Sequence, residues 1–144
     1  MSASESSISH GYSASNLLDG KGLNGKMMEG FCAHTNKDKT GWFSLELEEP
    51  QKISRIQITP RLNCCPQRQR NIRITIGPSE SYDPDEPRCL PDISQLVLEE
   101  GLTNYYCTGT LHEGKYVKIS REASKLNLCE VKIFTLTDIT SDSL

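Results

Sequence analysis

Residues 42–58, WFSLELEEPQKISRIQI, contain two segments in which apolar and polar side chains alternate, 42–47 and 53–58. A period of two places successive side chains on opposite faces of a β-strand, so each segment predicts a strand with one buried face. Proline beside acidic residues is typical of turns, and Glu49-Pro50 therefore predicts a turn between the two strands. The stretch indicates an all-β, antiparallel fold.

The same alternation recurs along the rest of the chain, at residues 72–76, 96–98, 116–119 and 126–134. Turn residues lie between these segments, for example Gly77-Pro78 and Glu113-Gly114. No segment of twelve or more residues carries a helical apolar stripe, apart from one turn near residues 14–19. The pattern predicts a β-sandwich of about eight strands.

Length and charge limit the number of domains and the kinds of partner. The 144 residues suffice for one domain; we expect it to span 1–144, with a core over about 6–135 and weakly ordered ends at 1–5 and 138–144. The net charge of −3 gives no general attraction to nucleic acid or to anionic membranes. No apolar run approaches the ~18 residues of a membrane-spanning helix, so we expect neither nucleic-acid binding nor membrane insertion.

Six cysteines indicate disulfides and hence a secreted, extracellular protein. They are Cys32, Cys64, Cys65, Cys89, Cys107 and Cys129. Their number is even, and the paired CxxC units of a zinc site are missing from the sequence. The spacing alone leaves every pairing open.

Residues 61–68, RLNCCPQR, follow a predicted strand directly and therefore lie at a strand end. A disulfide between adjacent cysteines closes a small, rigid ring that crosslinks almost no chain, so a role at the surface explains it better than stability. Arg61 and Arg68 flank the pair, and each guanidinium presents a planar fork of N–H donors. The stretch indicates a ligand-binding loop.

The order of His34, Arg61, Asn63, Cys64-Cys65 and Arg68 resembles the signature of the F-type lectins, or fucolectins. Cys89, Cys107 and residues 114–117 and 128–131 extend the resemblance over about residues 6–134. It implies a jelly-roll β-sandwich related to discoidin domains. It also implies three disulfides, Cys32–Cys129, Cys64–Cys65 and Cys89–Cys107.

The resemblance further implies reversible binding of terminal α-L-fucose. His34, Arg61 and Arg68 would hydrogen-bond the sugar, and the Cys64–Cys65 ring would pack against its apolar face. Fucose carries a methyl group in place of the 6-hydroxyl, so an apolar wall penalises sugars that must bury a hydroxyl there. A residue of the long polar loop 20–41, Met27, Met28 or Phe31, is expected to complete the wall. The sequence contains no nucleophile elbow, HExxH motif or phosphate loop, and we expect no enzymatic activity.

A structural calcium ion is implied as well. Its ligands would come from Asn16, Asp19, Lys21, Phe31, Cys129 and Glu130, largely through backbone carbonyls, with carboxylates from the two acidic residues. Oxygen ligands suit this hard cation. The ion would anchor loop 20–31 beside the Cys32–Cys129 bridge and thereby hold His34 in place.

Two features depart from the family pattern. Asn63 stands where the family has Asp, and the chain begins without the family's first strand, which leaves an edge open unless another segment substitutes for it. The alternative interpretation is therefore a discoidin-like adhesion module that has lost fucose binding and recognises protein or lipid head groups. Because one domain supplies one weak sugar site, we expect a homo-oligomer or a protein with tandem domains.

Overall fold

The computed structural model describes residues 2–7, 13–18, 32–36, 40–61, 70–81, 88–95, 103–106, 112–121 and 125–135. Within these ranges the strands are β1 (Ser2–Glu5), β2 (Ala33–His34), β3 (Gly41–Pro60), β4 (Arg70–Gly77), β5 (Arg88–Gln95), β6 (Thr103–Tyr106), β7 (His112–Arg121) and β8 (Asn127–Thr135), and a short 3-10 helix, η1, spans Ala14–Leu17. All strand pairs are antiparallel, which confirms the predicted fold class. No helix in the described ranges is long and apolar enough to cross a membrane.

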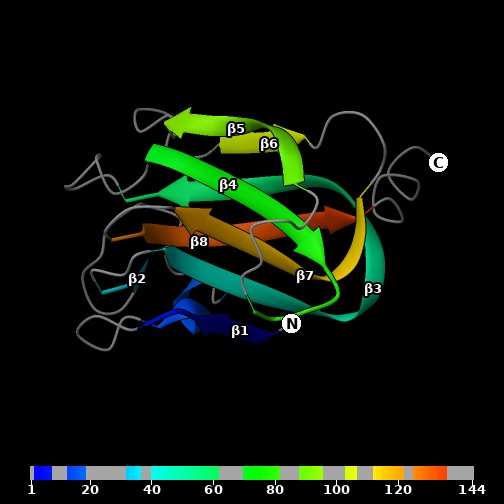
Figure 1. The fold of residues 1–144 in the computed structure, drawn as a ribbon, viewed down its shortest axis with the longest axis horizontal. Coiled ribbons are helices and arrows are strands. Elements are labelled where there is room, and N and C mark those ends of the chain that lie inside the picture. The colour runs from blue at the N-terminus through cyan, green and yellow to red at the C-terminus, as the bar shows by residue number, and fades with distance from the viewer. Residues whose placement is uncertain are drawn as a thin grey trace.

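β3 joins the two layers of the sandwich. Its first part, residues 41–46, pairs with β1 and β7, and its last part, residues 53–60, pairs with β8 and β6. The register shifts between Glu46 and Gln51, and Figure 1 shows β3 curving round at that end of the molecule. One layer therefore has the order β1-β3-β7-β4-β5, and the other has the order β2-β8-β3-β6.

The turn predicted at Glu49-Pro50 is a bend inside one continuous strand. Residues 47–50 have no partner in the β3–β7 ladder, because that ladder resumes only at Gln51. A proline lacks the N–H that a ladder needs, so it is tolerated at such an irregularity. Two predicted strands are thus one strand that changes layers.

The hydrophobic core lies between the two layers. In the first layer, Phe43 pairs with Ile119 and Leu45 pairs with Val117. In the second, Ile58 pairs with Val131. Each of these side chains is almost fully buried, and so are Leu17, Ile53, Ile56, Ile72, Ile74, Ile76, Leu126 and Leu128. The period-two pattern therefore identified the core-facing side chains of β3, β4, β7 and β8.

The N-terminal segment supplies an edge strand. β1 pairs with residues 43–46 of β3, and the backbone N–H of Ser6 donates to the carbonyl of Trp42 at 3.0 Å. Residues 2–5 thus pair with the edge that the sequence analysis left either open or covered by another segment. An edge strand offers unpaired N–H and C=O groups to any segment that can reach it, even one as polar as SASE.

The rest of the chain differs from the sequence analysis in two strands, β5 and β6, which were not predicted. The strand predicted at residues 96–98 and the tail at 138–144 lie outside the described residues.

Candidate functional site

His34 lies on β2, a two-residue strand that pairs with the start of β8, where His34 is opposite Asn127. The disulfide between Cys32 and Cys129 joins the same two strands across 97 residues of chain, which confirms the predicted pairing. Two further bonds fix the end of β2: the N–H of Thr35 donates to the carbonyl of Leu126 at 3.0 Å, and the Leu126 N–H donates to Thr35 Oγ1 at 2.9 Å. The His34 side chain is 4% exposed, so its ring is held in packed surroundings.

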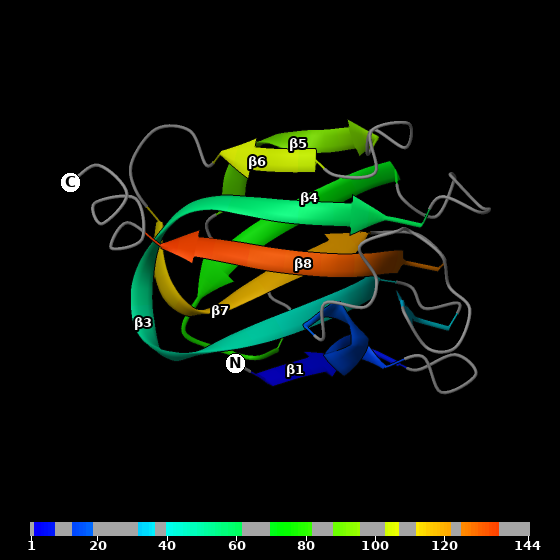
Figure 2. The same cartoon turned by 180° about the vertical axis from the view of Figure 1, so that it is seen from behind.

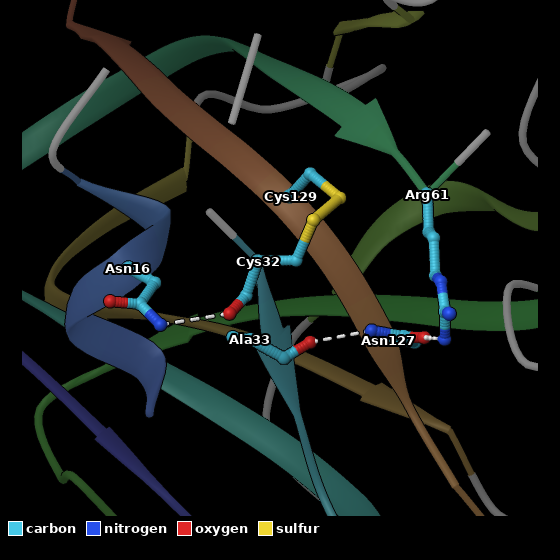
Figure 3. Close-up of a disulfide and its surroundings, with 6 residues drawn as sticks. All are labelled: Asn16, Cys32, Ala33, Arg61, Asn127 and Cys129. Carbon is cyan, nitrogen blue, oxygen red and sulfur yellow. Dashed lines mark hydrogen bonds between the residues drawn. A yellow bond between two sulfur atoms is a disulfide. The ribbon is translucent and has the colours of Figure 1, made fainter. Parts of the chain in front are cut away.

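Arg61 follows the last residue of β3 and reaches the same end of the sandwich. Its Nη1 donates to Oδ1 of Asn127 at 2.9 Å, and Nδ2 of Asn127 donates to the carbonyl of Ala33 at 2.8 Å. Figure 3 shows this chain of contacts beside the disulfide. The structure therefore brings the predicted residues His34 and Arg61 to neighbouring positions, with Asn127 between their strands.

Asn127 was missed by the sequence analysis. It is fully buried and begins β8, where a polar residue would ordinarily be assigned to a solvated strand end. Its partners lie 66 and 94 residues away along the chain. No local pattern records such contacts, so only the topology of β2, β8 and β3 reveals them.

A second group of predicted residues gathers at η1. Nδ2 of Asn16 donates to the carbonyl of Cys32 at 2.9 Å, and η1 packs against both β2 and β8. Glu130 follows Cys129 on β8 and is 3% exposed. Buried carboxylates and backbone carbonyls are the kinds of oxygen donor that suit a hard cation such as calcium. Asn16 and Cys129 are thus both linked to Cys32, and Glu130 follows Cys129 on β8.

No group of three His, Cys, Asp or Glu side chains in the described part of the chain is arranged to hold a metal ion. A calcium site built largely from carbonyls does not require such a group. The other predicted ligands, Asp19, Lys21 and Phe31, lie outside the described residues.

The remaining predicted site residues also lie outside the described ranges. They are Met27, Met28, Phe31, Asn63, Cys64, Cys65 and Arg68. Cys107 is outside as well, and Cys89 is described only as a backbone position of β5. The Cys64–Cys65 and Cys89–Cys107 disulfides therefore stay predictions.

A different polar cluster occupies the bend of β3. Glu46 accepts a hydrogen bond from Ser2 at 3.0 Å and from the Tyr116 hydroxyl at 3.2 Å, and it forms an ion pair with Lys115 at 3.1 Å. The Lys115 contact is the main reason that the pKa of Glu46 lies below its usual value. The pKa of Lys115 is raised in turn by the hydrogen bond to Glu46. Ser2, Glu46 and Lys115 border a shallow hollow with Leu47 and Glu48, and the Lys115 and Glu46 side chains are partly exposed.

The comparisons of this chain with known proteins agree with one another on its family. Residues 16–119 match the model of the F5/F8 type C family, described as a NedA-like, galactose-binding domain. The chain is 32% identical over 124 residues to the pentraxin fusion protein of Xenopus laevis, a match that covers 84% of this chain and 29% of that protein. It is 32% identical over 125 residues to fucolectin-3 of Anguilla japonica, covering 85% of this chain and 67% of that protein.

A solved structure agrees with the sequence matches. The crystal structure of a fucolectin from the serum of striped bass, Morone saxatilis, superposes with a TM-score of 0.81 at 29% identity. The match covers 93% of this chain and 46% of that one. The chain therefore spans less than half of the striped bass protein and less than a third of the pentraxin fusion protein.

Proposed function

Because the chain belongs to the F-type lectin (fucolectin) family, we propose that it binds terminal α-L-fucose on glycans, reversibly and without a chemical reaction. The observation that carries the proposal is the placement of His34 and Arg61. These residues are 27 positions apart in the sequence, yet both contact or oppose Asn127 at one end of the sandwich.

Recognition of a neutral sugar depends on directional hydrogen bonds rather than on charge attraction. Hydroxyl and ring oxygens accept from a guanidinium, which presents its N–H donors in a fixed plane, and charge on the donor strengthens each bond. We assign this part to Arg61, with His34 and Arg68 as the other polar contacts. The Cys64–Cys65 ring is proposed as the apolar platform beneath the hexose.

Discrimination between sugars is assigned to the 6-position. The family model is described as galactose-binding, so galactose is the main competing sugar. Fucose presents a methyl group where galactose presents a hydroxymethyl group. An apolar wall formed with Met27 or Phe31 would leave a hydroxyl without a partner, and burial of an unpaired polar group costs free energy. Asn63 stands where the family has Asp, and we expect this replacement to affect the preference between fucose and galactose.

We also propose a structural calcium ion held by Asn16, Asp19, Lys21, Phe31, Cys129 and Glu130. The ion would supply a fixed positive centre for carbonyl and carboxylate oxygens and would raise the unfolding midpoint by binding only the folded state. The residues themselves support this role, because Asn16 is bonded to Cys32, and Cys32 is linked to Cys129 beside the buried Glu130. Chelation is expected to lower the unfolding midpoint in the absence of sugar.

The setting we propose is extracellular and multivalent. The Cys32–Cys129 disulfide is typical of a protein that folds in an oxidising compartment. A single sugar site gives weak binding, and several linked sites raise the effective affinity by roughly a hundredfold or more when the geometry permits. We therefore propose a homo-oligomer or a tandem-domain protein as the functional form.

The test is a calorimetric titration of the oxidised protein in calcium with L-fucose, D-galactose and D-glucose. Saturable binding of L-fucose is expected, and Arg61→Ala should weaken it by roughly tenfold to a hundredfold for each charged hydrogen bond lost. Arg55→Ala is the matched control. Arg55 lies on β3, the strand that Arg61 follows, but its guanidinium stacks on the Phe134 ring, 3.9 Å from the ring centroid, and we expect unchanged binding.

Two results would count against the proposal. The first is an absence of heat with L-fucose at millimolar concentration, and the second is equal affinity in the wild type and Arg61→Ala. Either result would favour the discoidin-like adhesion module, with protein or lipid head groups as its ligands.

A further inference from the structure

We infer that Asn127 is the positioning residue of the sugar site: it fixes the Arg61 guanidinium relative to the strand that carries His34. The inference rests on the proposed function, since it assigns Arg61 to the sugar. Asn127 is assigned a positioning role because the oxygen of its side-chain amide is bonded to Arg61 and the nitrogen is bonded to the Ala33 carbonyl.

The chemistry of the two partners permits only one orientation of the Asn127 amide. A guanidinium can only donate hydrogen bonds, and a backbone carbonyl can only accept them. Arg61 Nη1 must therefore meet the amide oxygen, at 2.9 Å, and the Ala33 carbonyl must meet the amide nitrogen, at 2.8 Å. Because Asn127 is fully buried, a flip would leave two buried polar contacts unmade.

This contact couples three elements that carry or support the site. Ala33 directly precedes His34 on β2, Asn127 begins β8, and Arg61 follows β3. Figure 3 shows the three side by side, with the Cys32–Cys129 disulfide next to them. A long arginine side chain loses rotamer freedom when it binds a ligand. A site in which that freedom is already lost binds more tightly, because less ordering remains to be done.

An uncharged amide at position 127 affects Arg61 differently from a charged carboxylate. An amide oxygen is uncharged, so its bond orients the guanidinium without itself neutralising the charge that strengthens hydrogen bonds to sugar oxygens. A carboxylate at position 127 would pair with Arg61 but could not donate to the Ala33 carbonyl. Asparagine meets both requirements, and neither aspartate nor leucine does.

The first test compares L-fucose affinity, by NMR titration at millimolar sugar, in the wild type, Asn127→Leu and Asn127→Asp. Leucine has a similarly branched side chain but loses both hydrogen bonds, and we expect the dissociation constant to rise roughly tenfold to a hundredfold. Aspartate should also weaken binding. Gln57→Leu, the same loss of an amide on the partly exposed outer face of β3, is the control and should bind like the wild type. Equal affinity in a folded Asn127→Leu protein would overturn the inference.

The second test needs no substitution at position 127 and so survives a variant that fails to fold. It measures the order parameter of the Arg61 Nε–H bond in sugar-free wild type. A value near that of rigid backbone, about 0.85, and unchanged by sugar is expected. A value below about 0.6 that rises on adding L-fucose would mean that the sugar, not Asn127, orders Arg61.

The two readouts separate the inference from the proposed function. Failure of the wild type to bind L-fucose counts against the function. The order parameter, read without sugar, still upholds or refutes the restraint on Arg61.

Discussion

Two ends of the sandwich hold their polar side chains in opposite ways. At the end where β2, β8 and the last residue of β3 meet, on the left of Figure 1, the contacts are buried or part-buried, and the buried amide of Asn127 joins them. Amides bridge to carbonyls at 2.8 and 2.9 Å, and a disulfide lies among them.

The end at the bend of β3, on the right of Figure 1, is built from exposed charges. Lys115 and Glu46 form their ion pair with side chains that are 37% and 34% exposed. Water and salt screen such a pair, so it restrains its members weakly. The difference indicates that the chain fixes geometry where the proposed sugar-binding residues lie and restrains the opposite end more weakly.

The largest effect is expected from removing the disulfide at the buried end. The double variant Cys32→Ala with Cys129→Ala should lower the free energy of unfolding by about 3–5 kcal/mol, because the bridge closes a long loop. It should also weaken L-fucose binding, since β2 has only two residues and depends on its attachments. Urea unfolding monitored by circular dichroism, at fixed calcium, measures the change.

If the double variant loses less than about 1 kcal/mol of unfolding free energy, the contrast between the two ends is contradicted. It would mean that hydrogen bonding alone holds β2 on β8. The oxidised wild type, unfolded in the same calcium concentration, is the reference.

A smaller effect should distinguish a bonded hydroxyl from an unbonded one. Thr35 and Thr75 are both fully buried, but Thr35 Oγ1 accepts the Leu126 N–H at 2.9 Å, whereas Thr75 Oγ1 has no hydrogen-bond partner among the described residues. Thr35→Val keeps the shape and strands a buried amide, which should cost about 1–3 kcal/mol. Thr75→Val removes an unsatisfied hydroxyl and should be neutral or stabilising. Thermal unfolding of both variants sharpens the comparison, and equal effects would contradict it.

Much of the fold was predictable, because its main strands carry their own signal. The alternation at residues 72–76 and 116–119 lies within β4 and β7, and the alternation at 126–134 covers β8 with one residue before its start. β5 and β6 could not be found this way, because RCLPDISQ and TNYY have no clean alternation and their pairing is set by neighbouring strands. β1 is the extreme case, since SASE has no large apolar residue and is a strand only because β3 offers an edge.

The sequence predicted those residues of the candidate site that belong to a recognisable motif. The motif pointed to His34 and Arg61, the resemblance to the F-type lectins implied the Cys32–Cys129 pair, and the structure brings these together. Asn127 belongs to no such motif, because its role depends on which carbonyl and which guanidinium the topology places beside it. Positioning residues of this kind can be recognised only in the tertiary structure.

The smallest effect is expected at the exposed end, from Glu46→Gln. The pKa of Glu46 is lowered chiefly by the Lys115 hydrogen bond, so the carboxylate contributes stability above its unfolded-state pKa. That contribution is lost as the pH falls through the lower folded-state pKa. Unfolding midpoints of the wild type and the variant should therefore differ slightly at neutral pH and converge in acid.

Salt provides the decisive condition for this last comparison. Screening at about 1 M salt should remove the neutral-pH difference, because both partners face solvent. Glu48→Gln, a change of an exposed glutamate two residues along β3, is the matched control. L-fucose affinity should be unchanged in both variants, since the bend of β3 lies at the opposite end of the sandwich from the start of β8, where Asn127 lies. A difference that survives high salt, or one that grows in acid, would show that the bend holds its shape through Glu46 and would make the two ends alike.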